Sequence, residues 1–320
     1  MALEEAKVQM NLIDVTQQFK CDDDCLAYME SMRWPDGIRC PVCGCDKISK
    51  ITRKPGSKNK RTRIYQCLEE TCKQQFSATS GTIFNDSHLS LTKWFMALAL
   101  IVDAKKSISA NQLKEHLGIG SYRTAWYMAH RIRKAMENDW TEKMTGVVEM
   151  DETWVGGRYH GPEGRGRSHA NKEIVFGMKQ RSGELRMFHI DRANSETLAK
   201  YIRRNVSKDV ELVMTDDYSV YPKAFIKSRI HGIKHKTVNH SKGIYVEGNV
   251  TTNGIESAFG LFKRGVIGSF HKISIKHLHR YLSEFETRFN VRKADDRFNP
   301  TLQAMLGIEP MPYAELTAGD

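Results

Sequence analysis

Apolar residues recur with a helical period in the first half and the last third of the chain. Apolar side chains spaced three or four residues apart predict a helix with one buried face. The pattern is densest in residues 91–102, where nine consecutive apolar residues follow each other from 94 to 102. Helices are therefore expected over residues 91–102, 110–117, 122–137, 195–204, 251–263 and 274–290, with a looser helical pattern within residues 1–35.

Short apolar runs separated by charged or glycine-containing turns predict strands in the second half of the chain. These runs occupy residues 147–150, 174–178, 185–190 and 210–215. Three strands, then a helix, a fourth strand and further helices predict a mixed α/β domain over about residues 145–300.

The same patterns divide the chain into five parts. A turn-forming stretch, Trp34-Pro35-Asp36-Gly37, ends the first part. The expected parts are an N-terminal helical segment (1–35), a cysteine-rich segment (36–85), a helical segment (86–143), the α/β domain (144–300) and a loose C-terminal tail (301–320).

The composition of the chain indicates what kind of partner it binds and in which cellular compartment it is expected. The 320 residues include 49 Lys and Arg against 38 Asp and Glu, a formal net charge of +11. This excess favours a polyanionic partner such as nucleic acid. Residues 94–102 are too few for a membrane span, which takes about 20 apolar residues, and the charged N-terminus lacks the apolar core of a secretion signal. We therefore expect a cytoplasmic protein without a membrane partner.

Four of the seven cysteines have the spacing of a zinc ribbon. Cys40 and Cys43 belong to a Cys-Pro-x-Cys-Gly knuckle, and Cys67 and Cys72 form a second pair with four residues between them. Four thiolates favour tetrahedral Zn²⁺, which stabilises small modules of this kind. Cys45 is an alternative to Cys43, and the wider second pair departs from the usual knuckle. Cys21 and Cys25 are interpreted as ordinary side chains, since two thiols cannot complete a site.

A basic stretch lies between the two cysteine pairs. Residues 50–63 contain seven cationic residues and no acidic residue. Such a segment attracts DNA phosphates with little sequence preference, although most charge runs are simply solvated loops. The candidate DNA contacts are Arg53, Lys54, Lys58, Lys60, Arg61 and Arg63.

Residues 107–134 fit a helix-turn-helix. The first helix ends in Leu117-Gly118-Ile119, and Ser121 is placed to cap the second, basic helix. Three-helix units also occur as plain structural bundles, which is the alternative interpretation. The side chains predicted to face a DNA groove are Tyr122, Arg123, Tyr127, Arg131 and Lys134.

Carboxylates follow two of the predicted strands. Asp151 and Asp216 would face each other if these strands are neighbours, and two carboxylates at that distance repel unless cations lie between them. Hard oxygen ligands of this kind suit Mg²⁺. Glu256 and Lys263 are nearly two helical turns apart and share one helix face.

Neighbouring acids are the rivals for the same role. Strand alternation is expected to turn Glu152 and Asp217 away from the site. Glu149 shares the face of Asp151 and is either a supporting group or an alternative ligand. Two divalent metal ions bound by such acids activate an attacking oxygen and stabilise the leaving oxygen.

In combination, these motifs resemble a known family. The Cys-Pro-x-Cys-Gly ribbon is followed by Met-Asp-Glu-Thr-Trp-Val-Gly-Gly, Thr-Asp-Asp-Tyr, Val-Asn-His-Ser-Lys-Gly and Asn-Gly-Ile-Glu. The order is similar to that of bacterial insertion-sequence transposases of the IS fifteen-ninety-five (IS1595) family, over about residues 15–300. The resemblance implies a ribonuclease-H-like catalytic domain, with a mixed five-stranded sheet and helices, and a DDE mechanism. It assigns Asp151, Asp216 and Glu256 as ligands of Mg²⁺ or Mn²⁺, Lys263 as the associated basic residue, and His240 and Lys242 to the DNA channel.

The function expected on this basis is DNA transposition. The protein would bind the terminal inverted repeats, nick each end with Mg²⁺, and join the freed 3′-hydroxyl to target DNA by in-line phosphoryl transfer. We expect a homo-oligomer when two ends are paired, and a nucleoid-associated protein when it is bound to DNA. The alternatives are a non-catalytic DNA-binding regulator descended from a transposase and a structure-specific nuclease.

Overall fold

The computed structural model describes residues 10–52, 62–156, 172–181, 183–238 and 251–318, which fold into two compact units. The ribbon–helix unit comprises Met1–Ala104, Ile108–Met136 and Lys293–Asp320. The sheet unit comprises Lys105–Ser107 and Glu137–Arg292. The chain thus leaves the first unit for three residues between two of its helices, and returns to that unit at its C-terminal end. None of the described helices is long and apolar enough to cross a membrane.

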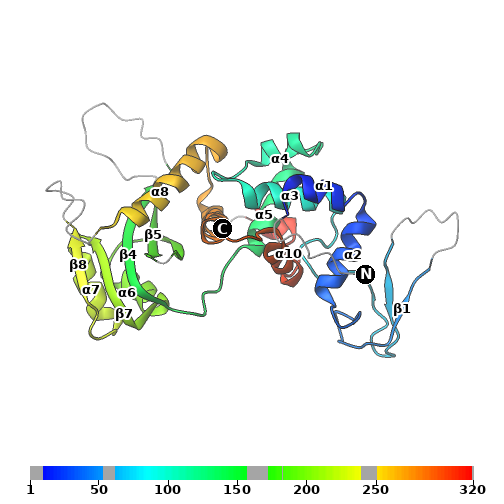
Figure 1. Ribbon diagram of the computed structural model, residues 1–320, viewed down its shortest axis with the longest axis horizontal. Helices are drawn as coiled ribbons and strands as arrows, with labels where there is room; N and C mark the ends of the chain where they lie inside the picture. Colours follow the sequence, from blue (N-terminus) through cyan, green and yellow to red (C-terminus); the bar gives the residue numbers. More distant parts are fainter. Residues whose placement is uncertain (1–9, 53–61, 157–171, 182, 239–250, 319–320) are drawn as a thin grey trace. The chain divides into compact units, whose positions relative to one another are not determined.

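The ribbon–helix unit combines a small sheet with a helical core (Figure 1). Its antiparallel sheet has the order β1-β2-β3. The central helix is α3, whose Trp94, Phe95 and Leu98 are almost entirely buried. The elements are α1 (Leu12–Gln18), α2 (Asp22–Arg33), β1 (Ile48–Lys50), β2 (Tyr65–Cys67), β3 (Gln75–Phe76), α3 (Leu91–Asp103), α4 (Ala110–His116), α5 (Tyr122–Ala135), α10 (Phe298–Gly307) and α11 (Tyr313–Thr317).

The expectation of a loose C-terminal tail is wrong. Helix α10 packs against α2, α3 and α5, and its Phe298, Leu302 and Met305 belong to the same hydrophobic core as α3. In α11, Leu316 is only 1% exposed. The segment therefore completes the core of the ribbon–helix unit, because the helices encoded before it leave an apolar surface that these side chains cover.

The sheet unit contains a mixed five-stranded sheet of order β6-β5-β4-β7-β8. The central strand β4 pairs antiparallel with β5 on one side and parallel with β7 on the other, so the sheet is mixed. The elements are β4 (Met144–Val155), β5 (Glu173–Gln180), β6 (Leu185–Ile190), α6 (Ser195–Asn205), β7 (Val206–Asp216), α7 (Val220–Ser228), β8 (His235–Val238), α8 (Asn253–Gly265), a π-helical turn η2 (Val266–Phe270), a 3₁₀ turn η3 (Ile275–His277) and α9 (Leu278–Asn290). The predicted mixed α/β fold with a five-stranded sheet is confirmed, while the apolar pattern did not locate α7 or the polar edge strand β8.

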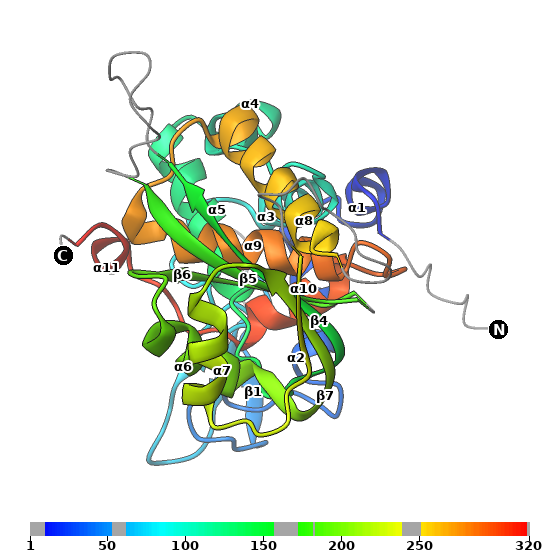
Figure 2. The same cartoon turned by 90° about the vertical axis from the view of Figure 1, so that its left-hand side faces the viewer.

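Helices cover both faces of this sheet. Figure 2 shows α8 on one side of the strands and α6 and α7 on the other. Alternate residues of β5 serve the two cores: Phe176 packs with the α6 and α7 side, and Val175 with α8 and α9. The central strands are thereby held from both faces, which fixes the direction of the side chains at their ends.

The assignment of α10 to the core gives a stability prediction. We expect Leu302→Ala to destabilise the ribbon–helix unit by about 2–5 kcal/mol, because a fully buried leucine leaves a cavity. The neighbouring Gln303 is exposed, and Gln303→Ala should change stability by less than about 0.5 kcal/mol. Urea dependence of hydrogen exchange at the α3 amides measures both effects. Equal protection in Leu302→Ala and the unsubstituted protein would show that α10 is dispensable.

Candidate functional site

An acidic cluster lies where β4 and β7 end their pairing. The last paired residues are Glu149 and Met214, and extending the parallel register by two residues brings Asp151 beside Asp216. Carboxylate oxygens of Asp151, Glu152 and Asp216 all lie within 4.8 Å of one another. The first and last of these are oriented by backbone N–H groups: Glu152 N donates to Asp151 Oδ1 at 2.8 Å, and Tyr218 N donates to Asp216 Oδ1 at 3.1 Å.

Glu152 belongs to this cluster, contrary to the expectation from strand alternation. Its cross-strand partner Phe176 packs with the α6 and α7 side, and it lies close to Tyr221 of α7, as alternation requires. The carboxylate nevertheless reaches Asp151 and Asp216, because the β4–β7 ladder has ended and no paired backbone separates the two faces there. Sequence periodicity gives the direction of a Cβ but not the reach of a longer side chain beyond a ladder.

Helix α8 brings a fourth acid and a base near this cluster, although Glu256 lies outside the group of oxygens within 4.8 Å of one another. The charge of Glu256 raises the pKa of Asp151, and the charge of Lys263 lowers it, so both groups lie near that carboxylate. Glu256 Oε1 accepts a hydrogen bond from Thr252 Oγ1 at 2.8 Å. Burial lowers the pKa of Lys263, and Asp151 opposes that effect. The sequence-based prediction that positions 256 and 263 share one helix face near Asp151 agrees with this arrangement.

The acids cannot all ionise easily without a cation. Burial raises the pKa of Asp151 to about 7, with a further contribution from the charge of Asp216. Burial likewise raises the pKa of Glu152 to about 8, and the charges of Asp151 and Asp216 add to it. The completely buried phenol of Tyr221 has its pKa raised by burial and then by Glu152. A divalent cation would remove the repulsion, and oxygen-rich sites of this kind suit Mg²⁺.

The two other acids considered from the sequence lie elsewhere. Asp217 is exposed. Glu149 is 3% exposed and turns toward α8, where its Oε2 accepts a hydrogen bond from the backbone N–H of Ile255 at 2.9 Å. Neither belongs to the group of oxygens formed by Asp151, Glu152 and Asp216.

The four expected cysteines converge in the ribbon. Sulfur atoms of Cys40, Cys43, Cys67 and Cys72 lie within 4.8 Å of one another. Cys45 is outside this group, and its sulfur accepts from the backbone N–H of Lys47 at 3.3 Å. Four convergent thiols suit one tetrahedral zinc ion. The wide spacing between the last two cysteines therefore does not prevent them from closing the site.

Comparison with known proteins decides the family. Residues 143–290 match a family model described as an ISXO2-like transposase domain. Residues 20–75 match a model described as a transposase zinc-ribbon domain, from the same family. The chain belongs to the IS1595 family of transposases. The transposase is also 27% identical over 278 residues to an "Uncharacterized protein in transposable element ISH50" of Halobacterium salinarum, a match that covers 82% of this chain and 89% of that protein. The five-stranded sheet with helices agrees with the ribonuclease-H-like domain expected of the family.

Most of the predicted basic contacts of the transposase fall outside the described residues. These are Arg53, Lys54, Lys58, Lys60, Arg61, His240 and Lys242. Arg63 is described, and its guanidinium pairs with Glu30 at 2.7 Å and Asp23 at 3.2 Å. Tyr65 Oη also donates to Glu30, at 2.9 Å. These contacts tie the ribbon to α2, so they give Arg63 a structural role that the charge pattern alone did not reveal.

The predicted DNA-reading face of α5 is partly covered. Arg131 is 3% exposed, stacks over the rings of Trp94 and Tyr127, and donates to Asn85 O at 2.8 Å. Tyr127 packs against Tyr313 of α11, with 5.3 Å between the ring centroids. Arg131 is therefore buried and does not face a groove in this structure, and Tyr127 is half-buried, because the C-terminal segment and α3 occupy the space around them. Of the same set, Tyr122 and Arg123 are exposed and Lys134 is half-buried.

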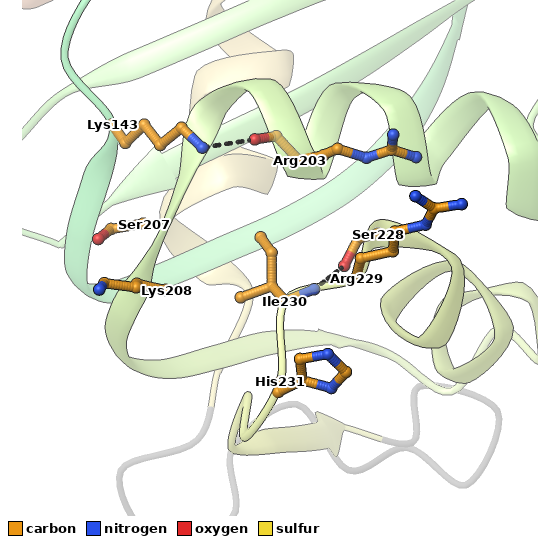
Figure 3. Close-up of a pocket in the computed structure, with 8 residues that line it drawn as sticks. All are labelled: Lys143, Arg203, Ser207, Lys208, Ser228, Arg229, Ile230 and His231. Atoms are coloured by element: carbon orange, nitrogen blue, oxygen red, sulfur yellow. Dashed lines mark hydrogen bonds between the residues drawn. The ribbon is translucent and has the colours of Figure 1, made fainter.

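A basic cavity of about 650 Å³ lies at the other end of the sheet (Figure 3). Its lining includes Lys143, Arg203, Lys208, Arg229 and His231, at the start of β4 and β7 and the ends of α6 and α7. Lys143 Nζ donates to the carbonyl oxygen of Arg203 at 2.8 Å. Cations are stabilised at helix C-termini by the exposed carbonyl groups. The two helix ends thus account for this basic lining, and the cavity is separate from the acidic cluster.

The ribbon geometry predicts a zinc-dependent unit. Cys67→Ser should leave the purified protein with less than one zinc ion per chain and a lower unfolding temperature, because three thiolates hold the ion less well than four. Cys21 is exposed and lies outside the four-thiol group, so Cys21→Ser should keep the zinc. Atomic emission spectrometry measures the metal content. Full zinc occupancy in Cys67→Ser would contradict the four-thiol site.

The acidic cluster predicts a pH-dependent stability. The pKa of Asp151 rises from 3.8 to about 7 on folding, so the native state holds a proton that the unfolded chain releases between these values. Stability should therefore fall as pH rises from about 4 to about 7 in buffer without added Mg²⁺. Asp151→Asn should flatten this fall, whereas Asp217→Asn at the exposed neighbouring acid should not. Chemical denaturation at pH 5 and pH 8 gives the comparison, and an unchanged slope in Asp151→Asn would contradict it.

Proposed function

We propose that this transposase cuts and joins DNA with a pair of Mg²⁺ ions held by Asp151, Asp216 and Glu256. The observation that carries this proposal is the crowding of the Asp151, Glu152 and Asp216 carboxylates at the ends of β4 and β7, with the pKa of Asp151 raised to about 7 and the charge of Glu256 contributing to that rise. Burial of these acids and the repulsion between them are together a cost to folding unless a cation offsets them. The donor set consists of hard oxygens, which fits Mg²⁺ or Mn²⁺.

When bound, such an ion pair activates the attacking oxygen and stabilises the leaving oxygen of an in-line phosphoryl transfer. The protein's own residues orient the reaction. The backbone N–H groups of Glu152 and Tyr218 fix the directions of the Asp151 and Asp216 carboxylates. Lys263, half-buried on the face of α8 that carries Glu256, supplies a positive charge for a DNA phosphate beside the cluster. In this proposal the attacking groups are water in the nicking step and a DNA 3′-hydroxyl in the joining step.

The ribbon–helix unit would hold the DNA ends. A structural zinc bound by Cys40, Cys43, Cys67 and Cys72 would keep the ribbon folded, and the basic stretch within it would contact phosphates. On α5, the exposed Tyr122 would touch DNA, as would the exposed Arg123, whose guanidinium lies 5.0 Å from the centre of the Tyr313 ring. The substrates would be terminal inverted repeats and target DNA, and joining two ends would require at least two copies of the chain.

The decisive experiment separates binding from chemistry. Asp151→Asn should abolish Mg²⁺-dependent nicking of a labelled element end, because it removes one charge from the proposed metal site, while end binding in a gel-shift assay stays within about twofold. Asp217→Asn is the matched control, since Asp217 is an exposed acid on the adjacent strand end, and it should cut normally.

Precleaved ends distinguish the remaining alternatives. A transposase joins a precleaved 3′ end to a second duplex, whereas a structure-specific nuclease cuts but does not join. A DNA-binding regulator would bind ends without either reaction. Nicking that survives in Asp151→Asn would exclude the proposed metal site.

A further inference from the structure

Glu149 connects the central strand to the first turn of α8. This carboxylate is 3% exposed, and its Oε2 accepts a hydrogen bond from the backbone N–H of Ile255 at 2.9 Å. Its Oε1 lies 3.5 Å from Nε of Arg181. The negative charge is therefore balanced by a cation on one side and directed at the start of a helix on the other.

The start of α8 receives a hydrogen-bond acceptor from outside the helix. The N-cap residue Thr252 makes no side-chain hydrogen bond to the helix backbone, and its hydroxyl donates to Glu256 instead. The first N–H groups of a helix have no partner within the helix and need one from elsewhere. Thr251 Oγ1 accepts from the N–H of Asn253 at 3.1 Å, and Glu149 accepts from the N–H of Ile255. A carboxylate at this end is also favoured by the helix dipole.

Gly254 makes room for this contact. A Cβ on Gly254 would lie 2.5 Å from Glu149 Oε2 and 2.9 Å from Nζ of Lys179. Both charged groups therefore occupy the space that a larger side chain would need. Lys179 is also the cross-strand partner of Glu149 on β5, so the strands and the helix meet at one compact polar contact.

This contact lies between two residues of the proposed metal site. Glu149 precedes Asp151 by two residues on β4, and Ile255 directly precedes Glu256 on α8. We propose that Glu149 is a positioning residue that sets the distance between Asp151 and Glu256, and that it is not itself a metal ligand. The inference rests on the proposed two-metal function. Side chains that hold metal ligands in place typically contribute 10–100-fold to metal affinity or activity.

The apolar side of α8 would survive the loss of Glu149. Ile255 and Phe259 are buried against β5, where Gly177 leaves space for both side chains. Removal of the carboxylate should therefore leave the helix folded and Ile255 packed, but remove the hydrogen bond that fixes the backbone directly before Glu256. This is the difference between a positioning role and a purely structural one.

The test is Mn²⁺ binding to the full-length protein, measured by electron paramagnetic resonance of the free ion. Glu149→Ala should weaken Mn²⁺ affinity about 10–100-fold. Glu149→Gln keeps an oxygen that can accept from Ile255 N–H, so affinity should stay within about threefold. Gly254→Ala retains the carboxylate but pushes it away from the helix, and should weaken binding as Glu149→Ala does, which keeps the test open if the latter fails to fold.

Glu286 provides a matched control in the same unit. It is 4% exposed and its carboxylate also accepts from a backbone N–H, that of Met187 on β6. Glu286→Ala should lower the unfolding temperature without changing Mn²⁺ affinity. In a nicking assay, Glu149→Ala should raise the half-saturating Mg²⁺ concentration more than it lowers the rate at saturating Mg²⁺.

Two results would overturn the positioning role. Unchanged Mn²⁺ affinity in folded Glu149→Ala would leave Glu149 a structural residue only. An equal loss in Glu149→Gln and Glu149→Ala would make it a ligand. Failure of the proposed function would give a different result. Either the unsubstituted protein would not bind Mn²⁺ at all, or Asp151→Asn and Asp216→Asn would bind Mn²⁺ as tightly as the unsubstituted protein does.

Discussion

The crowding of carboxylates at the ends of β4 and β7 is the constraint on which the sheet unit depends. Asp151, Glu152 and Asp216 place oxygens within 4.8 Å of one another, and Glu256 adds its charge from α8. Burial of Glu152 disfavours its charged form and raises its pKa to about 8, and the charges of Asp151 and Asp216 add to this effect. A fold can hold such a group only if the surrounding elements stabilise it or a cation neutralises it.

The sheet provides the stabilisation through its two hydrophobic cores. The cores on either face of β4 and β5 hold these strands, while α7 contributes Tyr221 behind Glu152 and α8 contributes Glu256 from the opposite face. The mixed direction of the sheet matters as well. Because β4 and β7 run parallel, their C-terminal ends lie side by side at the same end of the sheet. Asp151 and Asp216, 65 positions apart in sequence, become neighbours there. The hydrogen bond from the backbone N–H of Ile255 to Glu149 also holds the start of α8 against β4.

The ribbon–helix unit follows a different logic. Its small sheet has little apolar core, and the four convergent thiols lie in the place of the larger hydrophobic core that a bigger domain would have. The rest of the unit is a helical core that is complete only when α10 is included. Packing of α11 on α5 then uses Tyr127, and Arg131 is buried beneath the rings of Trp94 and Tyr127, although the sequence pattern of α5 predicts that both side chains face DNA. A basic residue on a helix is thus not free for a ligand until the packing around it is known.

Local pattern determined much of this protein. The cysteine spacing identified Cys40, Cys43, Cys67 and Cys72, and the apolar runs before Asp151 and Asp216 identified the two strands whose ends meet, since thiol pairs and strand alternation are set by residues close in sequence. Only the tertiary structure decided the place of Glu152 in the cluster, the contact of Glu149 with α8, the pairing of Arg63 and the role of α10. The edge strand β8 also escaped detection, because its polar sequence carries no alternation. Each of these features depends on contacts between residues distant in sequence. Such contacts are stabilised by packing and depend on the length of the side chains, which the periodicity of the sequence does not reveal.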